Sequence, residues 1–410
     1  MGPKADISTY EADCARNVAA WRRGEARGPL MMEVFPTNRC NLQCKHCWQR
    51  TNEYDKTYKT ELTDERLLRI VDEGHELGVR QWVIKGGGEP MARGKLVMNM
   101  FSRISELGMY GTLHTNGTLL KPEQIEALVS MGWFEVSFSI DGVNAENNDY
   151  LRSGGFDKAV TALRGIKAAR ERQGKKLPIT RVAMVVTRTN YQLLDQMVEL
   201  VHESGATTLG CGGMVEHTDL CNEFLLQPED RAALPRYVRK AMKRADELGL
   251  VNNLESFLHE EITANPSAME FGLEYASKRD FPDALCFAPF TEFVVHANGQ
   301  IGPCCMSYDE RANNLKDLSL REAWLGPYMT SVREHFLYNR PMSYCATCPT
   351  GHYTRIDRIR ESLKDRVRME AMNPAEKSVW LAARALESIK SRGVATTMQH
   401  AKKWVSVRMK

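Results

Sequence analysis

The segment with the most informative cysteine spacing reads Arg39-Cys40-Asn41-Leu42-Gln43-Cys44-Lys45-His46-Cys47-Trp48. Its three thiols have the spacing C-x3-C-x2-C and come directly after a predicted strand, residues 31–35. Three thiolates on one short loop can hold three irons of a cubane and leave the fourth iron open to a small molecule. The alternative is a zinc loop with a distant fourth ligand, for which His46 is a candidate, although zinc sites favour paired C-x2-C motifs.

Around this segment, short apolar runs alternate with amphipathic stretches. The runs predict strands at residues 31–35, 81–84, 111–115, 134–140, 181–187 and 207–210. The stretches between them predict helices at residues 63–77, 97–107, 122–131, 156–173 and 192–204. Six strands separated by helices predict an α/β fold, a parallel sheet curved into a partial (β/α)6 TIM-like barrel, with its chemistry at the carboxyl ends of the strands.

The bulk composition sets limits on function. The chain has 410 residues, 43% of them hydrophobic, and its 55 basic and 52 acidic residues give a net charge of +3. This near balance gives no general reason to expect a nucleic-acid partner. The sequence has no apolar segment long enough for a signal peptide or a membrane span, so we expect a soluble, cytoplasmic protein, in which eleven cysteines point to metal rather than disulfides.

The three-cysteine loop resembles that of the radical S-adenosylmethionine (SAM) superfamily. The resemblance implies a [4Fe-4S] cluster on Cys40, Cys44 and Cys47 that binds SAM and cleaves it to a 5′-deoxyadenosyl radical. The position before the third cysteine is often aromatic in that family, and here it is His46. Gly86-Gly87-Gly88-Glu89-Pro90 is similar to the family's GGEP segment, which implies that Gly87, Gly88 and Glu89 receive the SAM amino group.

Further landmarks of the family follow in order. Ser139-Ile140-Asp141-Gly142 resembles the SxDG element, which implies that Ser139 contacts the SAM ribose or carboxylate. Arg152 matches an arginine that pairs with the SAM carboxylate in many relatives, and the alternative is a solvated loop arginine. His114, Thr115 and Asn116 end the third strand and are weaker candidates for substrate or SAM contacts, because Asn116-Gly117 is also an ordinary turn.

A second group of cysteines has the pattern C-x12-G-x4-C-C, a long gap and C-x2-C, formed by Cys286, Gly299, Cys304, Cys305, Cys345 and Cys348. It resembles the SPASM/twitch domain of radical SAM enzymes, with Asn-Gly at residues 298–299 as a hairpin turn. No cysteine follows Cys348, so the resemblance implies the shortened twitch version with one auxiliary [4Fe-4S] cluster. Its ligands would be Cys286, Cys304, Cys345 and Cys348, with Cys305 a spare, and zinc is the alternative metal.

These features predict five regions. They are an N-terminal lead-in (residues 1–30), the radical SAM partial barrel (31–220), a helical bridge (221–280), the SPASM/twitch auxiliary-cluster domain (281–353) and a basic helical tail (354–410). The tail has two interpretations. It docks on the barrel, or it contacts an anionic membrane, nucleic acid or an acidic partner as a basic amphipathic segment.

Several residues have weaker claims. Cys211 follows the predicted sixth strand, and at the barrel mouth its thiol would donate a hydrogen atom to a substrate radical, as an epimerase requires. The alternative is core packing, since free cysteine is commonly a small buried hydrophobe. Glu216 and His217 are candidates for substrate binding, and Cys14 and Cys221 have no motif.

The predicted function is a radical SAM enzyme that abstracts a substrate hydrogen atom. We expect oxidation or epimerisation of a small or carrier-bound polar metabolite, because the lead-in is short for a leader-peptide-binding domain. The auxiliary cluster would accept an electron from the substrate radical, and a flavodoxin- or ferredoxin-type protein would supply electrons for SAM cleavage. One alternative is a peptide- or protein-modifying maturase. Another is a non-catalytic zinc protein contacting nucleic acid, which would have no use for the GGGEP and SxDG elements.

Overall fold

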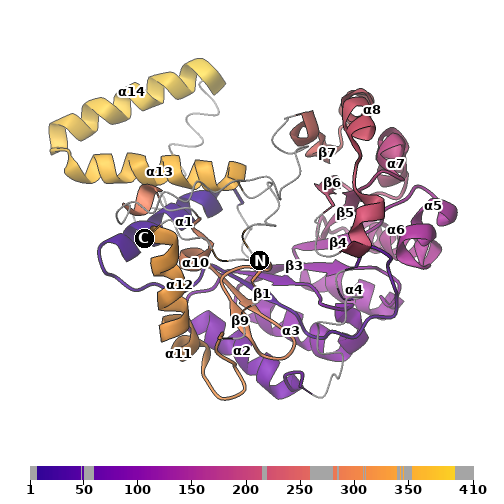
Figure 1. Cartoon of the computed structure of the whole chain (residues 1–410), viewed down its shortest axis with the longest axis horizontal. Helices are drawn as coiled ribbons and strands as arrows, with labels where there is room; N and C mark the ends of the chain where they lie inside the picture. The colour runs from indigo at the N-terminus through magenta and orange to yellow at the C-terminus, as the bar shows by residue number, and fades with distance from the viewer. Residues whose placement is uncertain are drawn as a thin grey trace.

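The computed structural model describes most of the chain. The described residues are 7–47, 49, 60–214, 219–258, 280–283, 286–307, 309, 311–338, 342, 345 and 353–392. Cys348, Glu216, His217 and the last eighteen residues of the basic tail, 393–410, lie outside this set. The architecture given below refers to the described residues alone (Figure 1).

A mostly parallel sheet forms the centre of the protein. Six parallel strands lie side by side in chain order, as predicted: β1 (Met31–Val34), β2 (Gln81–Ile84), β3 (Tyr110–Thr115), β4 (Glu135–Ser139), β5 (Ile179–Val186) and β6 (Thr208–Gly213). A short parallel strand, β7 (Val251–Asn252), continues the sheet beyond β6. The α/β prediction with a partial barrel is therefore confirmed.

The other edge of the sheet holds a feature that the sequence did not predict. Strand β8 (Glu292–Val295) pairs in parallel with β1, so that Met31 lies opposite Glu292 and Val34 opposite Val295. Strand β9 (Ile301–Gly302) then pairs antiparallel with β8. The hairpin of the second cysteine group is thus part of the same sheet as the barrel strand that leads into the first cysteine loop.

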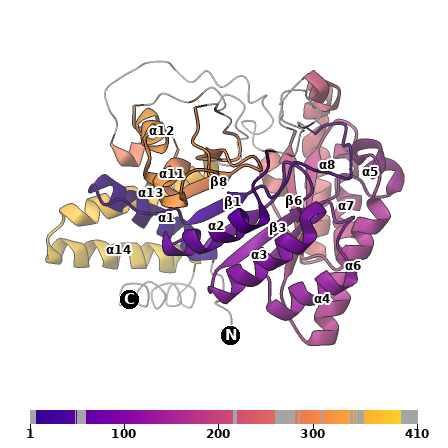
Figure 2. The same cartoon turned by 90° about the horizontal axis from the view of Figure 1, so that it is seen from below.

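Helices cover the convex face of the sheet (Figures 1 and 2). They are α2 (Asp64–Glu76), α3 (Gly94–Glu106), α4 (Pro122–Met131), α5 (Ala145–Arg152), α6 (Phe156–Gln173), α7 (Leu194–Glu203) and α8 (Pro228–Glu247). The predicted helix starts have local causes: the Thr63 side chain accepts the Arg66 N–H at 3.2 Å, and Pro122 and Pro228 are first helical residues. Helix α5 was not predicted, because its sequence AENNDYLR has little apolar periodicity.

Alternation along the strands separates two environments. Met32 and Val34 of β1, and Trp82 and Ile84 of β2, belong to the main hydrophobic cluster with the covering helices. Each such side chain contributes about 1.5–3 kcal/mol when it is fully buried. Because successive side chains point to opposite faces, Glu33 lies on the other, concave face of the sheet.

The two ends of the chain meet on one side of the sheet. Helix α1 (Ile7–Arg22) packs on α13 (Tyr353–Ala371) and on the short helix α10 (Ala288–Thr291) through a second hydrophobic cluster that includes Cys14, Phe290 and Leu363. Helices α11 (Leu320–Leu325) and α12 (Pro327–Leu337) lie beside it. Helix α14 (Pro374–Arg392) lies on the outer side of α13 (Figure 1).

Helix α14 has a complete N-terminal cap. The Asn373 side chain accepts the backbone N–H groups of Ala375 and Glu376, both at 3.0 Å, and Glu376 accepts the Asn373 N–H at 2.9 Å. Val379 and Leu386 of this helix are exposed. Among the helices that the structure describes, none has the length and apolar character needed to cross a membrane.

Candidate functional site

The first cysteine loop is fixed to the end of α5 by hydrogen bonds. The Lys45 N–H donates to the Leu151 carbonyl at 2.8 Å, and the Gln43 N–H donates to the Ser153 hydroxyl at 2.7 Å. The Cys44 thiol donates to the Arg152 carbonyl at 3.7 Å. The loop therefore has a defined path between β1 and α5, and its three thiols lie at the carboxyl end of the sheet, where the chemistry of such folds is expected.

The glycines of the GGGEP segment allow close contact with this loop. The Gly88 N–H donates to the Thr37 carbonyl at 2.9 Å, and the Glu89 N–H donates to the Arg39 carbonyl at 2.8 Å. A Cβ on Gly88 would lie 2.0 Å from the Arg39 carbonyl oxygen, and a Cβ on Gly87 would lie 2.0 Å from the Asn38 side-chain oxygen. A side chain at Gly88 would displace the backbone of the cysteine loop, and one at Gly87 would displace the Asn38 side chain.

Glu89 ties the same segment to the end of β3. Its carboxylate is 3% exposed and accepts three hydrogen bonds, from the Thr115 hydroxyl at 2.6 Å, the Asn116 N–H at 2.7 Å and the Met91 N–H at 3.0 Å. Burial raises the pKa of Glu89, and these hydrogen bonds oppose that shift. A carboxylate has about four acceptor positions, so the three protein donors do not exhaust its capacity for the SAM amino group.

A buried cluster of Asp141, Arg152 and His46 lies beside the loop. Asp141 is fully buried, and its Oδ1 accepts the Val185 N–H at 2.7 Å. Its Oδ2 lies 2.7 Å from Arg152 Nε and 3.5 Å from His46 Nε2. Asp141 Oδ2 and Arg152 Nε partner each other in this ion pair, whereas His46 Nδ1 is buried with no hydrogen-bond partner among the described protein atoms. A buried polar atom without a partner indicates a place where a polar ligand completes the site.

Electrostatic coupling joins the three thiols to this cluster. Burial raises the pKa of Cys40 and Cys47, and that of Cys44 to about 11, while the charge of Arg152 lowers the pKa of all three. The thiols also influence one another, so they lie close together. Iron binding requires thiolates, and burial disfavours a thiolate unless positive charge is near. Arg152 supplies part of that charge and the iron itself would supply the rest, so the donor set fits a cluster.

The remaining predicted SAM contact, Ser139, is the last residue of β4 and is half-buried. It stands two residues before Asp141, at the same end of the sheet. The structure thus brings the predicted residues of the cysteine loop, the GGGEP segment, Ser139 and Arg152 to one edge. The roles of these residues toward SAM stay predictions.

Three cysteines of the second group also gather. Cys286 precedes α10, Cys304 follows β9, and Cys345 is near Met342, whose carbonyl accepts the Cys345 N–H at 2.9 Å. Burial raises the pKa of Cys304, and nearby Cys305, Cys286 and Cys345 raise it further. Gly299 has φ of +90° in the hairpin turn, as predicted. The fourth predicted ligand, Cys348, lies outside the described residues.

No three His, Cys, Asp or Glu side chains within the described ranges converge on a point that could hold one metal ion. Thiolates that bind three different irons of a cubane need not meet at one point.

A polar layer lies on the concave face of the sheet. Lys85 Nζ is 2.8 Å from Glu33 Oε2, and Arg181 Nε donates to Glu135 Oε1 at 2.9 Å. Burial, and then the charges of Lys85 and Arg181, lower the pKa of His114 to about 3, so this imidazole is neutral at physiological pH. Lys85 also interacts with Cys305. Sequence reasoning missed Glu33 and Lys85, although charged residues inside otherwise apolar strand segments were a usable signal.

Cys211 occupies a different place from the predicted one. Strand β6 continues to Gly213, three residues beyond its predicted end, so Cys211 lies within the strand and not in the loop after it. Its side chain joins Leu209 in the main hydrophobic cluster on the convex face, and burial raises the pKa of its thiol to about 12. This placement agrees with the alternative interpretation, core packing. Cys221, which had no motif, is buried beside the cysteine loop and donates to the His46 carbonyl at 3.7 Å.

Comparison with known protein families gives two matches. Residues 34–201 match the family described as the radical SAM superfamily, and residues 286–349 match SPASM, an iron-sulfur cluster-binding domain. The first match contains the cysteine loop, the GGGEP segment, Ser139 and Arg152. The second contains Cys286, Cys304, Cys345 and Cys348.

Several curated proteins are similar to parts of this chain. The mycofactocin maturase MftC of Mycolicibacterium smegmatis is 34% identical over 200 residues, which cover 47% of this chain and 46% of that protein. The PqqA peptide cyclase of Granulibacter bethesdensis is 37% identical over 179 residues, 44% of this chain and 46% of the relative. These matches span about half the length of each relative. The AdoMet-dependent heme synthase of Nitratidesulfovibrio vulgaris is 26% identical over 338 residues, 78% of this chain and 84% of the relative.

Among solved structures, that of Streptococcus suis SuiB bound to S-adenosylmethionine superposes with a TM-score of 0.60 at 19% identity, covering 86% of this chain and 80% of that one. This likeness concerns the fold. The two family matches and the fit of the thiols identify the cofactors. They are a SAM-binding [4Fe-4S] cluster, SAM and an auxiliary iron-sulfur cluster. The chain belongs to the radical SAM superfamily and has a C-terminal auxiliary-cluster domain of the SPASM type.

Proposed function

We propose that this radical SAM enzyme modifies a peptide or a protein. The observation that carries the proposal is the identity of 34–37% to the mycofactocin maturase and the PqqA peptide cyclase, over 47% and 44% of the chain. A peptide substrate was the alternative in the sequence analysis. It now has better support than the small metabolite that we expected first.

In this proposal the carboxyl edge of the sheet binds SAM. Cys40, Cys44 and Cys47 hold the cluster, and the bound cluster and SAM supply a 5′-deoxyadenosyl radical that takes a hydrogen atom from the substrate. Gly87 and Gly88 keep the backbone close to the cysteine loop, and Glu89 has acceptor capacity left for the SAM amino group. Ser139 provides a hydroxyl at the same edge.

Arg152 and Asp141 act as a unit in the proposed site. Arg152 is the cation for the SAM carboxylate, a pairing that suits the planar guanidinium. Asp141 holds Arg152 in place through the 2.7 Å ion pair, and the same carboxylate oxygen, Oδ2, lies 3.5 Å from His46 Nε2. Because these groups are shielded from water, their geometry is fixed before SAM binds, and little reorganisation is needed.

The concave face is the proposed substrate chamber. Its Lys85–Glu33 and Arg181–Glu135 pairs and the neutral His114 offer donors and acceptors that suit the polar backbone of a peptide. The SPASM cysteines, Cys286, Cys304, Cys345 and Cys348, would hold the auxiliary cluster, and that cluster would supply an electron acceptor for a net oxidation. Oxidation is favoured over epimerisation, because the Cys211 side chain packs in the main hydrophobic cluster.

A second candidate substrate is a porphyrin-type molecule. It rests on the heme synthase relative, whose match extends over 78% of the chain at the lower identity of 26%. The electron donor of the flavodoxin or ferredoxin type and a membrane contact through the basic tail remain predictions.

The substrate class can be tested by hydrogen transfer. Cells of the organism that encodes the chain would be grown in deuterated medium, and their extract separated into a peptide and a small-molecule fraction. The reconstituted enzyme with SAM and dithionite should form monodeuterated 5′-deoxyadenosine with the peptide fraction, measured by mass spectrometry. The Cys40/Cys44/Cys47→Ala variant is the control without SAM cleavage. Deuterium transfer from the small-molecule fraction alone would contradict the peptide proposal and favour a metabolite or a porphyrin.

A further inference from the structure

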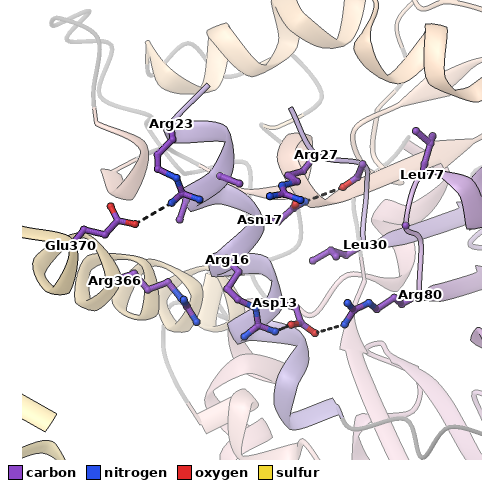
Figure 3. Close-up of a pocket in the computed structure, with 14 residues that line it drawn as sticks. Asp13, Arg16, Asn17, Arg23, Arg27, Leu30, Leu77, Arg80, Arg366 and Glu370 are labelled. Atoms are coloured by element: carbon purple, nitrogen blue, oxygen red, sulfur yellow. Dashed lines mark hydrogen bonds and ion pairs between the residues drawn. The ribbon is translucent and has the colours of Figure 1, made fainter. Parts of the chain in front are cut away.

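A cavity lies at the opposite end of the sheet from the first cysteine loop. It has a volume of about 470 Å³ and is enclosed by α1, α13 and the segments that enter β1 and β2. Residues 27–30 precede β1 and residues 77–80 precede β2, so the cavity is at the amino end of the strands. Figure 3 shows the side chains around it. The volume is within the range of small-molecule sites, roughly 300–1,000 Å³.

The lining of this cavity is rich in arginine. Five guanidinium groups surround the same space (Figure 3), those of Arg16, Arg23, Arg27, Arg80 and Arg366. Two carboxylates, Asp13 and Glu370, share the lining. A third, Glu25, stands next to it and pairs with two of the arginines. The arginines therefore outnumber the carboxylates within reach.

Each carboxylate serves more than one guanidinium. Asp13 pairs with Arg16 and lies 3.3 Å from Arg80 Nη1. Glu25 lies 2.9 Å from Arg23 Nε and 3.0 Å from Arg27 Nη2, and Arg23 Nη1 also reaches Glu370 at 3.0 Å. Burial and the nearby charge of Arg80 lower the pKa of Arg16. The cavity thus has an excess of positive charge that its own carboxylates only partly offset.

The walls of the cavity are already in place. The Asn17 side chain donates to the Gly28 carbonyl at 3.0 Å and to the buried Phe290 carbonyl at 2.9 Å, which fixes α1 to the segment entering β1. Ala19, Ala20, Gly28 and Gly78 contribute little volume, so the long arginine side chains provide most of the polar surface. A site assembled in advance binds with a smaller entropic cost.

We propose that this cavity binds a small anion with at least two phosphate or carboxylate groups, at a site separate from the radical chemistry. Arginine is the side chain that matches both oxyanions through paired N–H groups. The arginines come from α1, the two strand-entry segments and α13, so one multivalent anion bridges elements that are far apart in the sequence. A compact cavity in a chain with a net charge of only +3 fits a small anion rather than nucleic acid.

The test is titration calorimetry on the full-length, cluster-loaded protein, with pyrophosphate and citrate as probes in magnesium-free buffer of constant salt. Arg27 and Arg80 are suited to substitution because their side chains are 57% and 67% exposed, so an R27Q/R80Q variant should fold. The matched control is R69Q/R172Q, which removes two positive charges from exposed positions outside the cavity. Melting of each variant without a probe checks that it folds.

The proposal predicts saturable, one-to-one binding of at least one probe to the wild type. Affinity should fall at least about tenfold in R27Q/R80Q, because two charge-assisted contacts are lost, and should be unchanged in the control. Tighter binding of pyrophosphate would identify a phosphate ligand, and tighter binding of citrate a polycarboxylate. No saturable binding of either probe, or equal affinity in both double variants, would overturn the proposal.

Discussion

The two cysteine groups are held in place by different means. The loop of Cys40, Cys44 and Cys47 is tied by directed hydrogen bonds to α5 and to the GGGEP segment. Among the described residues, the cysteines of the SPASM domain also have hydrogen bonds, such as that from the Cys345 N–H to the Met342 carbonyl at 2.9 Å, and Cys286 and Cys345 border a small apolar cluster of Val332, Phe336 and Met342. The first loop is bonded to two neighbouring segments, whereas the second group combines local hydrogen bonds with apolar packing.

The difference corresponds to what each region has to do. A cluster with an open iron must present that iron to SAM at a defined place, so the path of its loop matters. A cluster with four protein ligands transfers electrons, and its potential depends on burial and hydrogen bonding more than on access. Strand β1 links both regions, because it leads into the first loop and pairs with β8 of the second.

The largest expected effect comes from removing the second group alone. The Cys286/Cys304/Cys345→Ala variant should lose about four of about eight irons, which chemical iron analysis would measure. It should still form 5′-deoxyadenosine from SAM and dithionite, because the first loop has its own supports. If this variant also lost SAM cleavage, the two regions would not be independent.

Asp141→Asn tests the buried anchor of the first region. The amide can still accept the Val185 N–H, so the change removes mainly the charge opposite Arg152. We expect the free energy of unfolding to fall by about 3–5 kcal/mol, measured by urea denaturation, because a buried cation loses its partner.

The matched control for Asp141→Asn is Asp72→Asn. Asp72 is 46% exposed and lies 2.7 Å from Arg103. An exposed pair of this kind contributes about 0–1 kcal/mol. Equal losses of unfolding free energy in the two variants would contradict the proposed role of Asp141 as the buried partner that holds Arg152 in place.

Gly88→Ala tests the backbone contact between the GGGEP segment and the cysteine loop. The new Cβ would overlap the Arg39 carbonyl oxygen at 2.0 Å, and neither backbone segment can turn away as a side chain would. We expect a loss of about 1–3 kcal/mol together with lower iron occupancy of the first cluster. Gly212→Ala is the control, since its Cβ would meet no atom within 4 Å. Normal iron content in Gly88→Ala would mean that the loop tolerates displacement.

The smallest effect is expected from Cys211→Ala. Its side chain packs in the hydrophobic core, so truncation should cost about 1 kcal/mol and leave product formation intact. Product analysis by mass spectrometry and thermal melting would measure both. Loss of product with unchanged SAM cleavage would restore the predicted role of this thiol as a hydrogen-atom donor.

Local patterns in the sequence predicted most of the fold. Short apolar runs located the six barrel strands, and the amphipathic stretch at residues 63–77 located helix α2. The pairing of β8 with β1 could not be predicted, because a parallel contact between distant segments depends on tertiary packing and leaves no local signal. Helix α5 escaped because it is short and polar.

The site was predicted unevenly for similar reasons. The cysteine spacing and the glycine run could be recognised in the sequence. The Asp141–Arg152 ion pair could not, because it forms only after helix α5 brings Arg152 back beside Asp141. Cys211 was expected after the strand because the glycines around it, Gly210, Gly212 and Gly213, are typical of a turn, whereas strand β6 continues to Gly213. Within a strand, residues two positions apart point to the same face, so Cys211 points to the same side as Leu209, toward the helices.

The central claim is that the first loop carries the SAM-cleaving cluster and the SPASM domain a second one. Iron, sulfide and 5′-deoxyadenosine should be measured on anaerobically reconstituted wild type and the Cys40/Cys44/Cys47→Ala variant with SAM and dithionite. We predict about eight irons in the wild type and about four in the variant, with deoxyadenosine from the wild type alone. Zinc in place of iron in the wild type, or equal deoxyadenosine from both proteins, would contradict the claim.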